Sequence, residues 1–271
     1  MEIAVLADNL SLPGFGQEHG LSLALTPDNG ELWLWDTGAS PLFLDTANKL
    51  GVDISRAKGL ALSHGHYDHA GGISHLLDIG FSGPIFAHPG YASPRFSVSR
   101  GEKTRSIGME KTSAPLPLPG IVEVSSRQEL APGLTMLADI PRLPGCPQYT
   151  DDFYFDAQAE KPDPVADDSC LLLESAKGPV LILGCCHSGL ANTLAHVREA
   201  MGVTSLHAVV GGLHLMDVGE RDFSEAASLL EDCGAQRIHA GHCTGNAALG
   251  YLQKRLGRRF APLGTGQRLV F

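Results

Sequence analysis

Short apolar runs and helical stripes alternate along most of the chain, and each pattern predicts one kind of element. Residues 21–25 and 31–36 are largely apolar around Pro27-Asp28-Asn29-Gly30, and an Asn-Gly pair between strands is a strong hairpin signal. Further strands are predicted at residues 1–8, 59–62, 84–88, 121–124, 134–140, 169–174, 180–184, 206–210 and 236–240. Helices are predicted at residues 41–51, 190–201, 223–233 and 246–256, and one more follows residue 72.

Residues 90–165 interrupt this order. Pro and Gly are frequent there and long helical periodicity is absent, so we expect a loop-rich insertion. Neither a linker nor a repeat separates it from the rest, which favours one domain over residues 1–271. Beyond residue 168, strands and helices alternate again, as in an α/β fold.

Four candidate metal ligands lie within six residues of the stretch LALSHGHYDHAGG, residues 60–72: His64, His66, Asp68 and His69. The apolar run before them predicts a strand, and the glycines after them precede a helix. A turn can aim several side chains at one point, and imidazole with carboxylate suits zinc, iron(II) or manganese. The alternative is a polar loop whose histidines only cap the next helix.

Three more histidines share one placement, just beyond an apolar strand and in a glycine-containing turn. They are His187 in GCCHSG, His214 in GGLHL and His242 in GHCTG. Strand ends are where α/β proteins gather their chemistry. One such histidine is usually a packed or capping residue, but three of them together with the first cluster favour a shared site.

His-x-His-x-Asp-His at a strand end resembles the signature of the metallo-β-lactamase superfamily. The resemblance implies a four-layer αββα sandwich with one or two metal ions at the sheet edges. The strings GCCHSG, GGLHL and GHCTG are similar to the branch that includes the dihydropterin-ribofuranosylaminobenzene-phosphate synthase of methanopterin biosynthesis. So are Glu18-His19-Gly20-Leu21-Ser22, Asp36-Thr37-Gly38 and Asp167-Asp168.

The resemblance also implies a ligand set. His64 and His66 match ligands of a first metal, and Asp68 and His69 match ligands of a second. Asp36 matches a residue that orients the ligand turn, although it is also explained as a simple turn aspartate.

The chain departs from the superfamily pattern in two places. Asp167-Asp168 replace the usual histidine between the two halves, and Cys185 replaces the usual bridging aspartate. We therefore assign His187 to the first metal and His242 to the second. Cys185 is either a bridging thiolate or a buried strand-end cysteine.

These residues predict a metal-dependent hydrolase in which a metal-activated water attacks a small anionic ester or phosphoester. Asp68 would steer the proton of the nucleophile, and His214 and His19 would hold or protonate the substrate. One alternative, from the resemblance, is a transferase that joins a dihydropterin to a ribosylaminobenzene phosphate. Another is an iron-dependent redox enzyme on the same ligands. One or two divalent ions are expected, zinc first, with iron or manganese as rivals.

Composition and charge limit the classes of molecule that the chain is expected to bind. The formal charge of −10 and the pI near 5.6 argue against nucleic-acid or anionic-membrane binding. Within this acidic chain, residues 95–111 carry five basic residues, of which Arg100 and Arg105 are candidates for binding an anionic substrate; the alternative is a solvated loop. Six cysteines without a secreted framework, and an N-terminus without a signal peptide, favour the cytoplasm. The sequence is compatible with a homo-oligomer.

Overall fold

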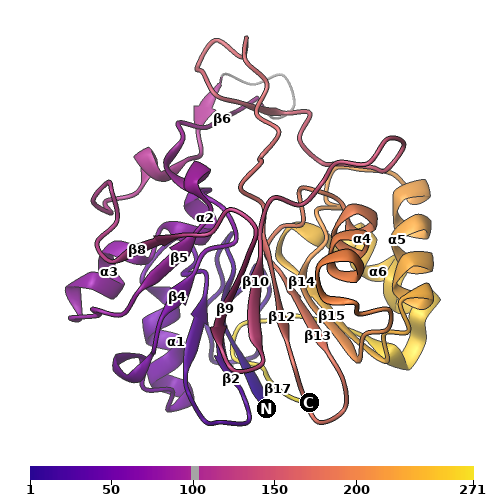
Figure 1. The fold of residues 1–271 in the computed structure, drawn as a ribbon, viewed down its shortest axis with the longest axis horizontal. Helices are drawn as coiled ribbons and strands as arrows, with labels where there is room; N and C mark the ends of the chain where they lie inside the picture. The colour runs from indigo at the N-terminus through magenta and orange to yellow at the C-terminus, as the bar shows by residue number, and fades with distance from the viewer. Residues whose placement is uncertain (99–103) are drawn as a thin grey trace.

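Two seven-stranded sheets form the centre of the computed structural model, which describes residues 1–98 and 104–271 (Figure 1). The first sheet contains β1 (Glu2–Ala7), β2 (Ser22–Thr26), β3 (Trp33–Trp35), β4 (Leu60–Ala61), β5 (Ile85–Ala87), β8 (Ile121–Glu123) and β17 (Arg268–Val270). The second contains β9 (Arg127–Ala131), β10 (Leu134–Leu137), β12 (Cys170–Leu173), β13 (Val180–Leu183), β14 (Ala208–Gly212), β15 (Arg237–Gly241) and β16 (Phe260–Pro262). Their strand orders are β17-β1-β2-β3-β4-β5-β8 and β16-β15-β14-β13-β12-β10-β9.

Helices cover the outer face of each sheet (Figure 1). The first sheet carries α1 (Leu42–Leu50), α2 (Tyr67–Ala70) and α3 (Ile73–Asp78), and the second carries α4 (Leu190–Met201), α5 (Glu220–Asp232) and α6 (Asn246–Leu256). Short 3₁₀ helices are η1 (Ile54–Arg56), η2 (Pro89–Ala92), η4 (Met109–Lys111), η5 (His242–Thr244) and η6 (Gly257–Arg259). The order helix, sheet, sheet, helix is the predicted αββα sandwich, which is therefore confirmed.

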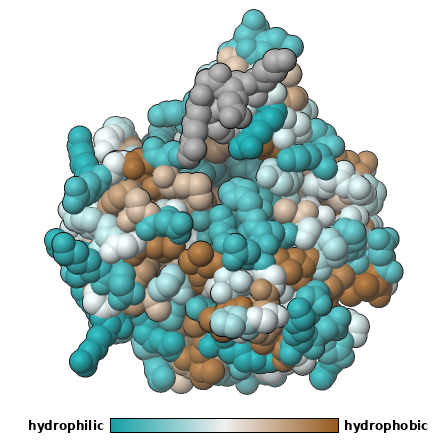
Figure 2. Space-filling view, turned by 180° about the vertical axis from the view of Figure 1, so that it is seen from behind, coloured by the Kyte–Doolittle hydropathy of each residue, from teal (hydrophilic) through white to brown (hydrophobic). Residues whose placement is uncertain are grey.

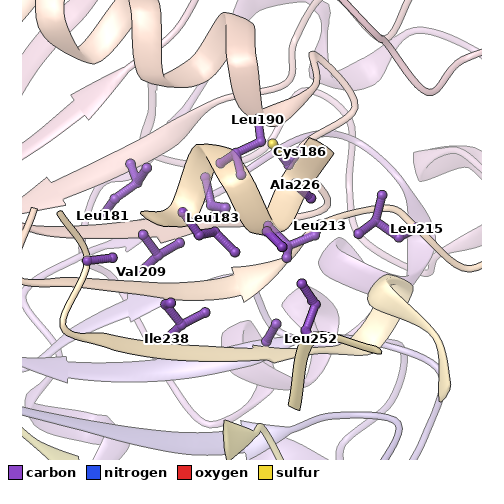
Figure 3. Close-up of a cluster of buried hydrophobic side chains, with 14 of the residues drawn as sticks. Leu181, Leu183, Cys186, Leu190, Val209, Leu213, Leu215, Ala226, Ile238 and Leu252 are labelled. Atoms are coloured by element: carbon purple, nitrogen blue, oxygen red, sulfur yellow. The ribbon is translucent and has the colours of Figure 1, made fainter. Parts of the chain in front are cut away.

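Alternating side chains along each strand create three apolar layers, because successive residues point to opposite faces. In β1, Ile3 and Val5 pack between the two sheets, whereas Ala4 and Leu6 pack against the helices of the first sheet. In β13, Leu181 and Leu183 face α4, α5 and α6 through Leu190, Ala226 and Leu252 (Figure 3). Each fully buried Leu or Ile contributes about 1.5–3 kcal/mol relative to an exposed one, which favours this layering.

The region predicted to be loop-rich divides into two parts. Residues 121–137 supply β8, β9 and β10 to the two large sheets. Around them, β6 (Phe96–Ser97), β7 (Arg105–Ser106) and β11 (Phe153–Tyr154) pair as a small sheet of order β11-β6-β7, at the top of Figure 1. This small sheet lies beyond the edge where the candidate ligands gather.

Most predicted elements form, with shifted ends. The first helix begins at Leu42 instead of residue 41, and the hydroxyl of Ser40 accepts a hydrogen bond from the Leu42 N–H. The second strand of the first hairpin is shorter than residues 31–36 because only Trp33–Trp35 pair with β2. Strands β9, β16 and β17 are not among the predictions. Their sequences are short and partly polar, so tertiary pairing and not periodicity defines them.

Parallel strands bring distant residues to one edge of the molecule. Strands β3, β4 and β5 run parallel in the first sheet, as do β13, β14 and β15 in the second. The indole N–H of Trp35 donates to the Leu183 carbonyl at 3.1 Å and so joins the two sheets. Gly184 permits this close approach, because a Cβ there would lie 2.3 Å from the side chain of Ser63.

Within residues 1–98 and 104–271, no helix combines the length and apolar character needed to cross a bilayer. On the face shown in Figure 2, apolar residues form separate areas among hydrophilic ones. The exposed large apolar side chains of the described part of the chain, such as Leu12, Ile79 and Val270, belong to elements far apart in sequence.

Candidate metal centre

The turn after β4 carries the first four candidate ligands. His64 and His66 lie in the turn, and Asp68 and His69 lie in the single turn of α2. The His66 carbonyl accepts hydrogen bonds from the backbone N–H groups of His69 and Ala70, both at 3.0 Å. This bonding folds the chain back on itself and directs the side chains of all four buried residues toward the edge of the sheet.

Asp36, directly after β3, holds this turn in place by hydrogen bonds. Its carboxylate accepts hydrogen bonds from the Ser63 N–H, the Ser63 hydroxyl and His69 Nδ1, each at 2.7 Å. Because the Ser63 hydroxyl donates to Asp36, it accepts from His64 Nδ1, which lies 2.8 Å away. Both imidazoles therefore carry their proton on Nδ1 and present the lone pair of Nε2 to the centre.

The second sheet supplies candidate ligands from three strand ends. Cys185 and His187 follow β13, His214 follows β14 and His242 follows β15. Three non-glycine residues in these turns have left-handed backbones: Cys186 with φ 62°, His214 with φ 48° and His242 with φ 49°. Each such residue costs about 1–3 kcal/mol, and such strain concentrates at functional sites.

Hydrogen bonds also orient His187 and His242. His187 Nδ1 donates to the Tyr149 carbonyl at 3.0 Å, and His242 Nδ1 donates to the side-chain oxygen of Asn9 at 2.9 Å. That Asn9 oxygen also accepts from the Gly20 N–H, which identifies it as the oxygen end of the amide. In both histidines the free lone pair is therefore on Nε2.

These lone pairs meet in two places. His64 Nε2 and His187 Nε2 are 3.3 Å apart, and His69 Nε2 and His242 Nε2 are 3.1 Å apart. Two lone pairs at such distances repel each other unless a cation lies between them. A tetrahedral ion with bonds of 2.0–2.1 Å places two ligand nitrogens about 3.3 Å apart. The donor set therefore fits metal ions.

Cys185 belongs to both places. Its sulfur groups with His64 and His187, and also with His69 and His242, with all ligand atoms of each group within 4.8 Å of one another. Asp68 adds a carboxylate oxygen 3.4 Å from His242 Nε2 and 3.2 Å from His19 Nε2. His66 Nδ1 lies 2.9 Å from His64 Nε2, and its buried Nε2 has no hydrogen-bond partner among the described residues.

The electrostatics favour neutral imidazoles at His64, His66 and His187, and a positive charge between His69 and His242. Burial lowers the pKa of His64, His66 and His187 well below the usual value, which keeps them in the form that binds metals. Burial also lowers the pKa of His69, but the carboxylates of Asp36 and Asp68 outweigh it and raise that pKa to about 9. The position between His69 and His242 thus demands positive charge, which a metal ion can supply in place of a proton.

A pocket of about 420 Å³ gives access to these residues. His19, His66, Asp68, Cys185, His187, His214, His242 and Cys243 line it. The insertion supplies much of the opposite wall. There Tyr149 lies 6.0 Å from His214 between ring centres, and Phe153 contacts His66, His187 and His214 at 5.1–5.9 Å. Arg105 also lines the pocket and is exposed.

The structure thus brings together the predicted residues His19, Asp36, His64, His66, Asp68, His69, Arg105, Cys185, His187, His214 and His242. Arg100 lies outside the described residues. His88, predicted to be a strand-end residue and not a ligand, lies 2.9 Å from Asp139 and outside the ligand groups.

Asn9 and Cys243 are not among the predicted site residues. Arg95 is one of the basic residues of the 95–111 segment, for which a solvated loop or an anion-attracting role is expected, but it is buried and pairs with Asp163 and Asp167. Arg95 Nη2 donates at 2.7 Å to one oxygen of Asp167, whose other oxygen accepts from the Gly65 N–H at 2.8 Å. Only Cys243 had a signal in the sequence, because it directly follows His242 in the same glycine-bounded turn.

The fold and this edge of histidines, aspartate and cysteine define a class of metalloprotein. The model of the metallo-beta-lactamase superfamily matches residues 16–185, and the chain belongs to this superfamily. It is accordingly an enzyme of a metal-dependent family.

Two relatives cover nearly the whole chain. One is 7,8-dihydropterin-6-methyl-4-(beta-D-ribofuranosyl)-aminobenzene-5'-phosphate synthase of Methanocaldococcus jannaschii, 26% identical over 95% of this chain and 91% of the relative. The other is the crystal structure of Tm1679, described as a metal-dependent hydrolase of the beta-lactamase superfamily. It is 27% identical with a TM-score of 0.84, over 100% of this chain and 99% of that one. A diphosphatase of the PhnP family shares the fold, with 14% identity and a TM-score of 0.59, over 100% of this chain and 97% of that one.

Proposed function

We propose that the chain is a metal-dependent hydrolase that uses a metal-activated water on a small anionic ester or phosphoester. The observation that carries the proposal is the pairing of Nε2 lone pairs at two places joined by Cys185, beside a pocket large enough for a small molecule. The likeness to Tm1679 over the whole chain supports a hydrolase.

Two ions account for the donor atoms. His64, His66 and His187 would hold the first, and Asp68, His69 and His242 the second. The Cys185 sulfur groups with residues of both sets and would be a donor for either ion. Burial raises the pKa of the Cys185 thiol well above its usual range, so only a bound cation would keep it as thiolate. A divalent ion here supplies Lewis-acid chemistry and lowers the pKa of a water molecule that it binds. Zinc or iron(II) suits the mixed imidazole and thiolate donors better than manganese does.

The chain's own residues orient the reactants and move the proton. Asp68 lies between His19 and His242, where its free oxygen can accept the proton of the attacking water. His19 receives a hydrogen bond on Nδ1 from the Asn9 amide at 3.2 Å, so its Nε2 proton points to Asp68. His214, which is half-buried in the pocket wall, is placed to hold a charged substrate oxygen or to protonate a leaving group.

Charge favours an anionic substrate. Two divalent ions would bring four positive charges against the two negative charges of Asp68 and the Cys185 thiolate. Arg105 adds positive charge at the pocket wall. An ester or phosphoester oxygen that gains negative charge in the transition state would be stabilised there.

The test combines metal analysis with a substrate screen. Protein purified without chelator should contain about one or two transition-metal ions, by the ligand count of the site. It should hydrolyse at least one member of a panel of phosphodiesters, phosphomonoesters and lactones, and chelation should abolish this activity. Well under half an equivalent of metal, or a panel without any chelator-sensitive hydrolysis, would contradict the proposal.

A synthase is the second candidate, because the likeness to the pterin-linked synthase covers 95% of the chain. The pocket wall also suits a flat, amino-substituted ring. Tyr149 and Phe153 bring aromatic rings to the pocket lining, and Asp151 and Asp152 line the same pocket. Incubation with a dihydropterin diphosphate and a ribosylaminobenzene phosphate distinguishes the two candidates: a condensed product without net hydrolysis favours the synthase.

A further inference from the structure

Cys243 has no part in the proposed hydrolysis, yet it lies inside the same pocket. It is 4% exposed and lines the pocket beside Cys185 and His214. The sulfur atoms of Cys185 and Cys243 and one ring nitrogen of His214 all lie within 4.8 Å of one another. The buried Nδ1 of His214 has no hydrogen-bond partner within residues 1–98 and 104–271. Two thiols and an imidazole thus face one small volume.

The backbone is shaped to bring Cys243 to this place. In a regular strand, the side chains of residues 242 and 243 would point to opposite faces. The left-handed conformation of His242 and the 3₁₀ turn η5 instead direct both side chains into the pocket. The absent side chain of Gly212 leaves room, because a Cβ there would lie 2.5 Å from the Cys243 sulfur.

We propose that Cys185, His214 and Cys243 form a third cation position, which takes a thiophilic transition metal such as zinc or iron(II). Thiolate and imidazole donors select such ions over magnesium, calcium or manganese. The Cys243 thiolate would offset one of the two positive charges of the added ion, since the charge of the Cys185 thiolate is shared with the hydrolase centre. The position shares Cys185 with the proposed hydrolase centre and therefore rests on that function.

A disulfide is the competing use of the two cysteines. The Cys243 thiol lies 3.5 Å from the Cys185 carbonyl oxygen, to which it donates a hydrogen bond, and the two sulfur atoms lie within 4.8 Å of each other. The imidazole of His214 in the same group has no role in a disulfide, whereas it completes a set of three metal donors. A search for the disulfide is therefore part of the test.

The test is a titration of the metal-free full chain with Co²⁺, because cobalt bound to thiolate has a charge-transfer band in the near ultraviolet. Cys243→Ser should bind about one Co²⁺ fewer than wild type, and its band should be roughly half as strong because one of two thiolates is lost. Cys170→Ser, a buried cysteine in β12 that faces the helices, is the matched control and should titrate like wild type. His214→Gln should lose the same equivalent with both thiolates retained.

Other outcomes would overturn the proposal. Equal Co²⁺ stoichiometry and equal band strength in wild type and Cys243→Ser would remove Cys243 from the metal centre, while the proposed hydrolase function would stand. A Cys185–Cys243 disulfide found by mass spectrometry in anaerobically purified protein would identify a redox pair instead. If Cys243→Ser is unfolded by circular dichroism, the half-buried His214→Gln decides, and unchanged stoichiometry in that variant rejects the third position.

Discussion

The two halves of the molecule build their shares of the centre in different ways. In the first sheet, one turn after one strand supplies His64, His66, Asp68 and His69. In the second sheet, Cys185, His187, His214 and His242 follow three different parallel strands, β13, β14 and β15. The first arrangement is local and visible in sequence, whereas the second exists only when β13, β14 and β15 pair.

The two halves also differ in how their histidines are oriented. In the first half a single buried carboxylate, Asp36, orients the ring of His69 by a direct hydrogen bond and the ring of His64 through the hydroxyl of Ser63. In the second half His187 depends on the Tyr149 carbonyl of the insertion, and His242 depends on Asn9 of the other sheet. Asp36 and Ser63 of the first half therefore orient His64 and His69, whereas His187 and His242 depend on residues from distant segments.

Cys185→Ser is expected to have the largest effect. Among the described residues, only Cys185 belongs both to the ligand group of His64 and His187 and to that of His69 and His242. Serine keeps the shape and removes the soft donor. Turnover should be abolished, and metal content by mass spectrometry should fall for both ions, since each loses its one soft donor while three other ligands remain. Cys170→Ser controls for loss of a buried thiol. Wild-type metal content in Cys185→Ser would separate the two halves into independent sites.

Asp68→Asn probes the first half alone. The amide keeps the shape but cannot take the proton of the attacking water, so kcat should fall at least ~100-fold. Metal content, by mass spectrometry, should fall by no more than about half, because the ligands of the first ion remain. His75→Ala, on α3 outside the pocket, should retain activity. Wild-type turnover in Asp68→Asn would remove Asp68 from the mechanism.

Asp167→Asn tests whether the ligand turn also depends on the insertion. Asp167 holds both Arg95 and the Gly65 N–H, whereas Asp163 contacts Arg95 at 3.4 Å without touching the turn. Each substitution breaks a buried ion pair and should cost about 3–5 kcal/mol of stability in chemical unfolding. Only Asp167→Asn should also weaken metal binding, by ~10–100-fold. Equal metal affinity in Asp163→Asn and Asp167→Asn would show that the turn supports itself.

Arg105→Glu should have the smallest effect. The exposed side chain lines the pocket, and reversing its charge should raise KM for an anionic substrate about fivefold to tenfold, with kcat nearly unchanged. The dependence of KM on salt should weaken as well. Lys177→Glu makes the same charge change in the turn between β12 and β13, far from the pocket residues, and should leave KM unchanged. An unaltered KM in Arg105→Glu would assign Arg105 to a solvated loop.

The sequence alone was sufficient wherever the signal is local. The His-x-His-x-Asp-His turn predicted the family, and the alternation of apolar residues predicted most strands and the helices α4 and α6 to the residue. The histidines after three apolar strands were predicted to share a site, because parallel strands bring their carboxyl ends to one edge of a sheet.

Tertiary structure decided what depends on residues far apart in the chain. No local pattern indicates that Asn9 orients His242, that Arg95 anchors the ligand turn through Asp167, or that Cys185 lies between two groups of imidazoles. The Arg95–Asp167 and Asn9–His242 contacts join residues 72 and 233 positions apart and arise only in the folded chain. Periodicity reports which face of an element is buried, whereas the position of a hydrogen-bonding atom is set by the packing of all elements together.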